Sequence, residues 1–209
     1  MKNKYSKKWA AWLVLVTLFL NILAPMPLWA AEQAEGTVPE AQAALNQAAQ
    51  WMAKQHGDFT LRAGYPAPDV DNSAFLLARM NGLSAAASRN YYQAATEYVA
   101  SAANEGNFYV TAQAKMIMAV NALGYAPDAM GQIDLLGQFL AYDFNQGYKD
   151  PAVCTAILNV LASKTYTPQN YTAADVLSYL LTYQNSDGGF HSAYSDASDI
   201  DTTGDILFT

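Results

Sequence analysis

The sequence predicts an all-α protein made of repeated helical hairpins, and three observations carry this prediction. Apolar residues recur at helical spacing through most of the chain, and no stretch alternates strictly enough to predict a strand. An aromatic–aliphatic pair returns about every forty residues, and a glycine-containing turn with an aromatic residue follows each pair. Self-similarity at this period is typical of a repeat architecture, because each hairpin buries its apolar face against its neighbours.

Residues 1–31 are predicted to be a secretion signal, removed on export. Four of the first eight residues are lysines, residues 10–23 are apolar, and two prolines follow that run. An uncleaved N-terminal anchor is the alternative, although the run is shorter than the ~18 to 20 residues that span a bilayer. No later segment could cross a membrane. Residues 32–40 are polar, with one glycine and one proline, which predicts a linker before a repeat domain at 41–209.

The first helix of each hairpin is predicted to end near its aromatic–aliphatic pair. These pairs are Trp51-Met52, Tyr98-Val99, Phe139-Leu140 and Tyr179-Leu180, at spacings of 47, 41 and 40 residues. The turns that follow are Gly57-Asp58-Phe59, Gly106-Asn107-Phe108, Gly147-Tyr148 and Gly188-Gly189-Phe190. The third turn is one residue shorter than the first two, so its aromatic residue follows the glycine directly.

The second helices are predicted over residues 72–81, 109–123 and 151–163, and from 202 onward. They are rich in Ala, Leu, Met and Ile nearly all round, which indicates helices buried on most sides. Residues that favour a helix start lie at their beginnings, namely Asp71, Asp150 with Pro151, and Asp201. The last helix has room for only two to three turns, so we expect the repeat domain to be incomplete at its C-terminal end.

The fourth turn resembles the glutamine–aromatic repeat of squalene cyclases and protein prenyltransferase β subunits, of the terpenoid cyclase and prenyltransferase superfamily. Gln184 would tie down the hairpin end and Phe190, where tryptophan is usual, would pack over it. Residues 112–190 resemble a bacterial secreted branch of this superfamily, similar to the helical domain of transcobalamin and intrinsic factor. The resemblance implies an α/α toroid of about four hairpins, with each second helix on an inner ring. At the glutamine position the second and third units have Ala103 and Phe144.

Net charge excludes some partners. All four lysines of residues 1–8 belong to the predicted signal, and without it seven basic residues face 18 acidic ones, a net charge of −11. Nucleic acid and anionic membrane surfaces both require a basic footprint, so neither is an expected partner.

Two D-x-D pairs, Asp69-Val70-Asp71 and Asp199-Ile200-Asp201, are the sharpest candidates for chemistry. Class II terpene cyclases protonate an alkene with an aspartic acid in an apolar cavity, and by this resemblance Asp201 would be the proton donor and Asp199 its partner. Thr202 stands where that motif has its third aspartate. The favoured interpretation is that both pairs cap helices, because an aspartate accepts hydrogen bonds from first-turn amides.

No metal site or cofactor is expected. Cys154 lies in an apolar run and is predicted to be a small core residue rather than a nucleophile or zinc ligand. His56 and His191 each lie in a turn, and both are predicted to be solvated. Asp187, in the glycine-rich turn, is predicted to shape that turn.

Tyrosine is the commonest aromatic residue, with fourteen copies. Many lie near hairpin ends, where they either pack between helices or line the mouth of a cavity for a flat or apolar ligand. These tyrosines are Tyr65, Tyr91, Tyr92, Tyr109, Tyr142, Tyr148, Tyr183 and Tyr194.

These observations favour a secreted or cell-surface module without catalytic activity. Its expected ligand is a small apolar or corrinoid-like molecule, or else a protein partner at the cell surface. The alternative is a class II terpene cyclase that uses Asp201, and a structural element of a surface layer would need only the repeats.

The signal predicts export. Residues 1–34 fused to a reporter should carry it out of the cytoplasm, because they combine positive charge with a sufficient apolar run. Reporter activity in cytoplasmic and extracytoplasmic fractions measures this, and a reporter retained in the cytoplasm would contradict the secreted assignment.

Overall fold

The computed structural model describes residues 38–56, 59, 68–105 and 108–207. The chain divides into two units between Ala48 and Ala49, and the described part of the first unit is the beginning of one helix. The predicted signal at 1–31 lies outside the described residues. Apart from the first residues of α3, the features described below belong to the second unit, which begins at Ala49.

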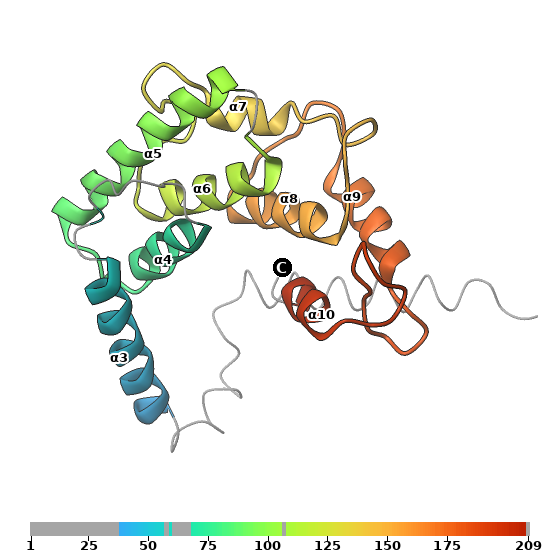
Figure 1. Ribbon diagram of the computed structural model, residues 1–209, viewed down its shortest axis with the longest axis horizontal. Coiled ribbons are helices and arrows are strands. Elements are labelled where there is room, and N and C mark those ends of the chain that lie inside the picture. Colours follow the sequence, from blue (N-terminus) through green and yellow to red (C-terminus); the bar gives the residue numbers. More distant parts are fainter. Residues whose placement is uncertain (1–37, 57–58, 60–67, 106–107, 208–209) are drawn as a thin grey trace, which may run out of the picture. The chain divides into compact units, whose positions relative to one another are not determined.

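Helices account for all the regular secondary structure in the described ranges, so the all-α prediction is confirmed (Figure 1). The helices that correspond to the predicted first helices are α3 (Val38–His56), α5 (Ala85–Glu105), α7 (Leu135–Leu140) and α9 (Ala173–Leu180), the last followed by the 3₁₀ turn η1 (Leu181–Tyr183). The second helices are α4 (Pro68–Arg79), α6 (Val110–Ala122), α8 (Pro151–Ser163) and α10 (Ile200–Leu207). Within the described ranges, none of the helices could reach across a bilayer.

The second helices pack on one another in chain order. α4 lies against α6, α6 against α8, and α8 against α10, while α7 packs on α6 and α9 packs on α8. Figure 1 shows α4, α6 and α8 in succession, with α5, α7 and α9 on their outer side. α6 and α8 bury residues on several faces, as their apolar composition predicts.

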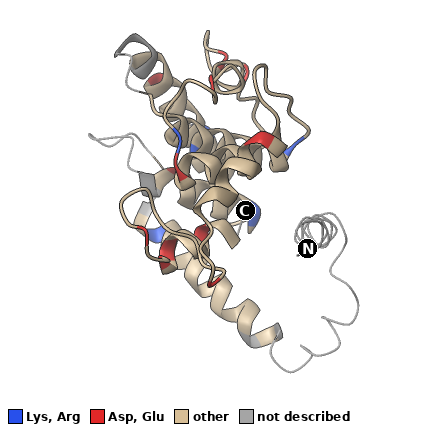
Figure 2. Ribbon diagram, turned by 90° about the vertical axis from the view of Figure 1, so that its right-hand side faces the viewer, with Lys and Arg blue, Asp and Glu red and all other residues tan. Residues whose placement is uncertain are grey.

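Local signals explain where the central helices begin and end. The Asp150 carboxylate accepts a hydrogen bond of 2.8 Å from the Val153 amide, and Pro151 occupies the first helical position of α8. α6 ends in a Schellman turn, in which Gly124 at φ 80° lets the Tyr125 amide reach the Val120 carbonyl. Charged residues are few along this fold, and most of the ribbon in Figure 2 carries neither sign.

Three boundaries that were predicted from the sequence differ from those of the structure. α4 begins at Pro68, so Asp71 lies inside its first turns rather than at its cap, and the Asp71 side chain is only 3 % exposed. There its carboxylate accepts a 2.7 Å hydrogen bond from the buried Tyr91 hydroxyl of α5. α10 begins at Ile200, before Asp201. α3 also begins within the predicted linker, at Val38.

Cys154 is fully buried in α8, as its apolar surroundings predict. Burial, reinforced by the negative charge of Asp150, raises the pKa of the Cys154 thiol from 9.0 to about 12. The neutral thiol is therefore the form that the fold favours. Its contribution to stability is complete below pH 9 and is lost as the pH rises toward 12.

We expect Cys154 of the folded protein to resist thiol reagents. At pH 8 its thiolate fraction is roughly a thousandfold below that of a free thiol, and no reagent reaches it without local opening. A chromogenic disulfide reagent should label Cys154 roughly a hundredfold or more slowly in the folded protein than in denaturant. Since Cys154 is the one cysteine of the chain, fast labelling of the folded protein would contradict its burial directly.

Candidate functional site: a tyrosine-lined pocket

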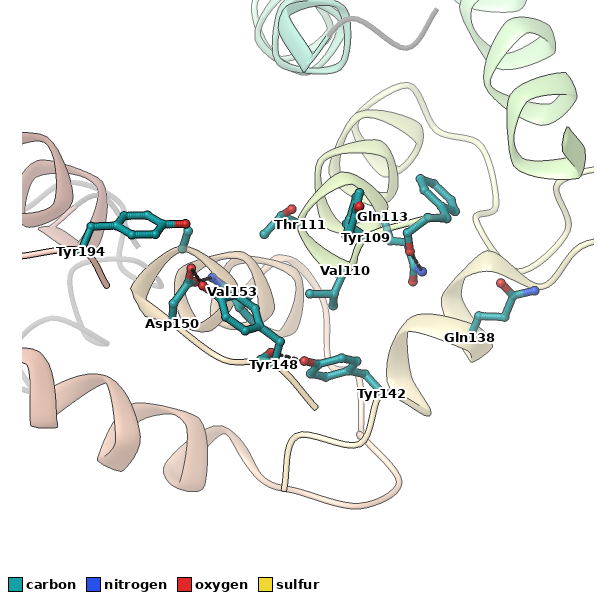
Figure 3. A pocket seen from close by; sticks show the side chains of 12 residues that line it. Tyr109, Val110, Thr111, Gln113, Gln138, Tyr142, Tyr148, Asp150, Val153 and Tyr194 are labelled. Carbon is teal, nitrogen blue, oxygen red and sulfur yellow. Dashed lines mark hydrogen bonds between the residues drawn. The ribbon is translucent and has the colours of Figure 1, made fainter. Parts of the chain in front are cut away.

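A pocket of about 450 Å³ opens where α6 and α8 begin (Figure 3). This volume lies in the range of small-molecule sites, which are lined mainly by apolar and aromatic groups with a few polar ones. We call it the tyrosine pocket. It is lined by Phe108, Tyr109, Val110, Thr111, Gln113, Gln138, Tyr142, Tyr148, Asp150, Ala152, Val153 and Tyr194.

Three of the lining tyrosines are unusually exposed. Tyr109, Tyr148 and Tyr194 are 75 %, 65 % and 90 % exposed. Among the described residues, the one other aromatic side chain exposed to this degree is Trp51 in α3. Three exposed rings from separate segments therefore converge on one pocket, although packing between helices would have buried them.

The exposure of Tyr148 sets the third turn apart from the first and the fourth. The aromatic residues of the first and fourth turns, Phe59 and Phe190, are buried. In the third unit Phe144 is buried instead, with its ring 5.8 Å from that of Tyr179 in an edge-to-face arrangement. Phe144 thus contributes a buried aromatic ring to the third unit, while Tyr148 stays exposed and lines the pocket.

Asp150 joins the helix start to the pocket. One carboxylate oxygen caps α8, and the other accepts a 3.0 Å hydrogen bond from the Tyr148 hydroxyl. This hydrogen bond and the negative charge of Asp150, with a smaller effect of the nearby Tyr194 hydroxyl, raise the pKa of Tyr148 from 10.0 to about 12. Tyr148 therefore keeps its proton throughout the physiological range and remains a hydrogen-bond donor to Asp150.

Tyr142 fixes the backbone of the same turn. Its hydroxyl donates a hydrogen bond to the Tyr148 carbonyl oxygen. A Cβ atom at Gly147 would lie 2.6 Å from the Tyr142 hydroxyl oxygen and 2.7 Å from the Asp143 carbonyl oxygen, so this approach requires glycine. Figure 3 shows the hydroxyls of Tyr142 and Tyr194 directed toward Tyr148 from opposite sides.

A smaller hollow of about 190 Å³ adjoins the tyrosine pocket. The two share Asp150, Ala152 and Tyr194, so they adjoin at the beginning of α8, and the smaller hollow extends along α10. The smaller hollow adds the carboxylate of Asp205 and the side chain of Ile206 from α10.

The aspartates of the predicted cyclase motif do not line either hollow. Asp199 caps α10, because its carboxylate accepts a 2.6 Å hydrogen bond from the Thr202 amide. Hydrogen bonds from the amide and the side chain of Thr202 hold the pKa of Asp199 below its usual value. Asp201 is exposed in the first turn of α10. A cap therefore exists at this pair as predicted, but Asp199 supplies it rather than Asp201.

The polar side chains of Gln184 and Asp187 in the fourth turn form hydrogen bonds within the chain. Gln184 donates to the Gly188 carbonyl oxygen at 3.1 Å, which ties the turn as the glutamine–aromatic resemblance implies. Asp187 accepts from the Gly189 amide and from the Ser198 hydroxyl, and these bonds lower its pKa. Asp187 therefore shapes the turn, as its position predicts.

His191 is half-buried rather than fully solvated, with its ring 4.8 Å from that of Tyr183. The side chain of His56 lies outside the part of the chain that is described. Within that part, no three His, Cys, Asp or Glu side chains are grouped so that they could hold a metal ion.

The tyrosines predicted from the sequence separate into two sets. Tyr109, Tyr142, Tyr148 and Tyr194 meet at the pocket. Of the others, Tyr91 is fully buried, Tyr92 stacks on Tyr125, Tyr183 packs on His191, and Tyr65 lies outside the described residues. The sequence did not single out Gln113 or Gln138, and it assigned Asp150 only a helix start.

Comparisons of the chain with protein-family models, with curated proteins and with solved structures give no match. The resemblance to the squalene-cyclase type of repeat therefore stays a prediction that rests on the residues quoted for it.

The two aspartates of the last helix should differ in their effect on stability. Asp199→Ala should lower the melting temperature by roughly 2 to 4 °C, because it removes the helix cap. Asp199→Asn should retain most of the stability that the cap provides, because asparagine caps a helix about as well as aspartate. Asp201→Ala should have the smaller effect, since Asp201 is exposed and is not the cap. Because the pKa of Asp199 is lowered, its contribution should disappear as the pH falls through that pKa.

Thermal unfolding of the three variants at pH 7 and near pH 3 measures this difference. A larger loss from Asp201→Ala than from Asp199→Ala would contradict the assignment of the cap.

Proposed function

We propose that this chain is a secreted or cell-surface binding module, without catalytic activity, whose tyrosine pocket holds a small ligand with a flat or apolar face. The observation that carries the proposal is the convergence of Tyr109, Tyr148 and Tyr194, each from a different segment and each exposed. Exposed tyrosine rings offer apolar area with a polar tip, which suits ligand recognition more than internal packing.

The chemistry of the lining supports binding rather than catalysis. The carboxylate of Asp150 is held by the Val153 amide and the Tyr148 hydroxyl. The thiol of Cys154 is buried and has a raised pKa, so it is a poor nucleophile. The cyclase alternative would need Asp201 in an apolar cavity, and Asp201 is exposed instead.

The succession of second helices supports an α/α toroid as the finer architecture. α4, α6, α8 and α10 pack on one another in order, and the first helices α7 and α9 pack on them. In such an arrangement the second helices run side by side, so that their beginnings gather at one end. The tyrosine pocket lies at the beginnings of α6 and α8, and the smaller hollow lies at the beginning of α8 and along α10.

Binding of a neutral, flat fluorescent probe should depend on the exposed tyrosines. We expect N-phenyl-1-naphthylamine to gain fluorescence in the pocket, and Tyr194→Ala to weaken its affinity about three- to tenfold, as the loss of one aromatic contact does. Tyr194 is 90 % exposed, so its removal should leave the fold unchanged. Trp51→Ala is the matched control, since Trp51 is an exposed aromatic residue outside the pocket.

Two further ligands separate the possible functions. Dicyanocobinamide, followed by its absorbance in equilibrium dialysis, tests the corrinoid-like ligand that the resemblance implies. Turnover of squalene that is lost in Asp201→Asn would favour the cyclase. Probe binding that is equal in the wild type, Tyr194→Ala and Trp51→Ala would overturn the proposed pocket.

A further inference from the structure

The lining of the tyrosine pocket is aromatic and acidic. Asp150 lines both the pocket and the adjoining hollow, and Asp205 lines the hollow. No Lys, Arg or His is among the described residues that line either one. We propose that the tyrosine pocket selects an organic cation with apolar substituents, of the quaternary ammonium type. This inference rests on the proposed binding function and names the class of its ligand.

The exposed rings supply one half of the recognition. A cation is attracted to the face of an aromatic ring within about 6 Å, and quaternary ammonium groups are typically held by several rings at once. Tyr109 precedes α6, Tyr148 precedes α8, and Tyr194 lies in the loop before α10. Rings on three different segments can enclose a compact, apolar head group in a volume of about 450 Å³.

Asp150 supplies the other half. Its carboxylate is half-buried, and an opposite charge interacts with it more strongly there than in bulk water. The hydrogen bond from the Tyr148 hydroxyl to this carboxylate leaves the phenol oxygen more electron-rich, which strengthens the negative face of the Tyr148 ring. The net charge of −7 further favours cations over anions near the surface.

The chain already holds an ammonium group on aromatic rings beside the pocket. The Lys149 Nζ atom lies 4.9 Å from the ring centre of Phe144 and 5.0 Å from that of Tyr179. It also donates to the carbonyl oxygen of Phe144 at 3.0 Å. Lys149 is thus held by these partners and does not line the pocket. Its ammonium group therefore does not take the place of a cationic ligand beside Asp150.

One feature favours an anion instead. The beginnings of α6 and α8 both lie at the pocket, and the amides of a first helical turn attract negative charge. At α8 the carboxylate of Asp150 already occupies this position. At α6 no side chain caps the helix. Inorganic phosphate is therefore the competing probe in the experiment below.

The experiment compares choline with its neutral carbon isostere, 3,3-dimethylbutan-1-ol, on the full chain. The two have nearly the same shape, so a difference in affinity reports the charge. We expect choline to bind at least tenfold more tightly, in titrations followed by tyrosine resonances in NMR spectra. Asp150→Asn should reduce this preference to about threefold or less, because asparagine still caps α8 but carries no charge.

Asp134→Asn is the matched control. Asp134 caps α7 through the Gly137 amide as Asp150 caps α8, and it lies outside the pocket. It should leave the preference for choline unchanged. Equal affinity for choline and the alcohol, binding of neither, or binding of phosphate in their place would each overturn the cation selectivity. If the naphthylamine probe still depends on Tyr194, the proposed binding function stands without this selectivity.

Discussion

The capped start of α8 is the constraint on which the rest of the site depends. α8 packs against α6, α9 and α10, and its first turn buries Pro151 and Val153. A helix start in these surroundings needs a local acceptor for its free amides, and Asp150 provides one. The same carboxylate accepts a hydrogen bond from the Tyr148 hydroxyl, so the residue that stabilises the start of α8 also orients a ring that lines the pocket.

The pocket forms where the repeat departs from its own pattern. In the first and fourth units the turn aromatic is buried, whereas in the third unit Phe144 is buried and the turn aromatic Tyr148 is exposed. Tyr148 then adds no stability through burial and is available for recognition.

The two D-x-D pairs show that one motif can serve two physical ends. The carboxylate of Asp199 accepts a hydrogen bond from an amide of the first turn of α10. The carboxylate of Asp71 is buried and accepts a hydrogen bond from the hydroxyl of Tyr91 in α5. The difference follows from where each helix begins, at Ile200 just after Asp199 and at Pro68 well before Asp71. Neither pair is part of the pocket lining.

The sequence by itself determined the helical class, the burial of Cys154 and the start of α8, since these depend on local spacing and capping. It also marked the pocket tyrosines, but only within a larger set that included the buried Tyr91. Tertiary structure alone decided which tyrosines face a cavity, and it brought Tyr109, Tyr148 and Tyr194 to one place beside Asp150. Side chains from three segments meet only through helix packing, and no local pattern in the chain encodes that meeting.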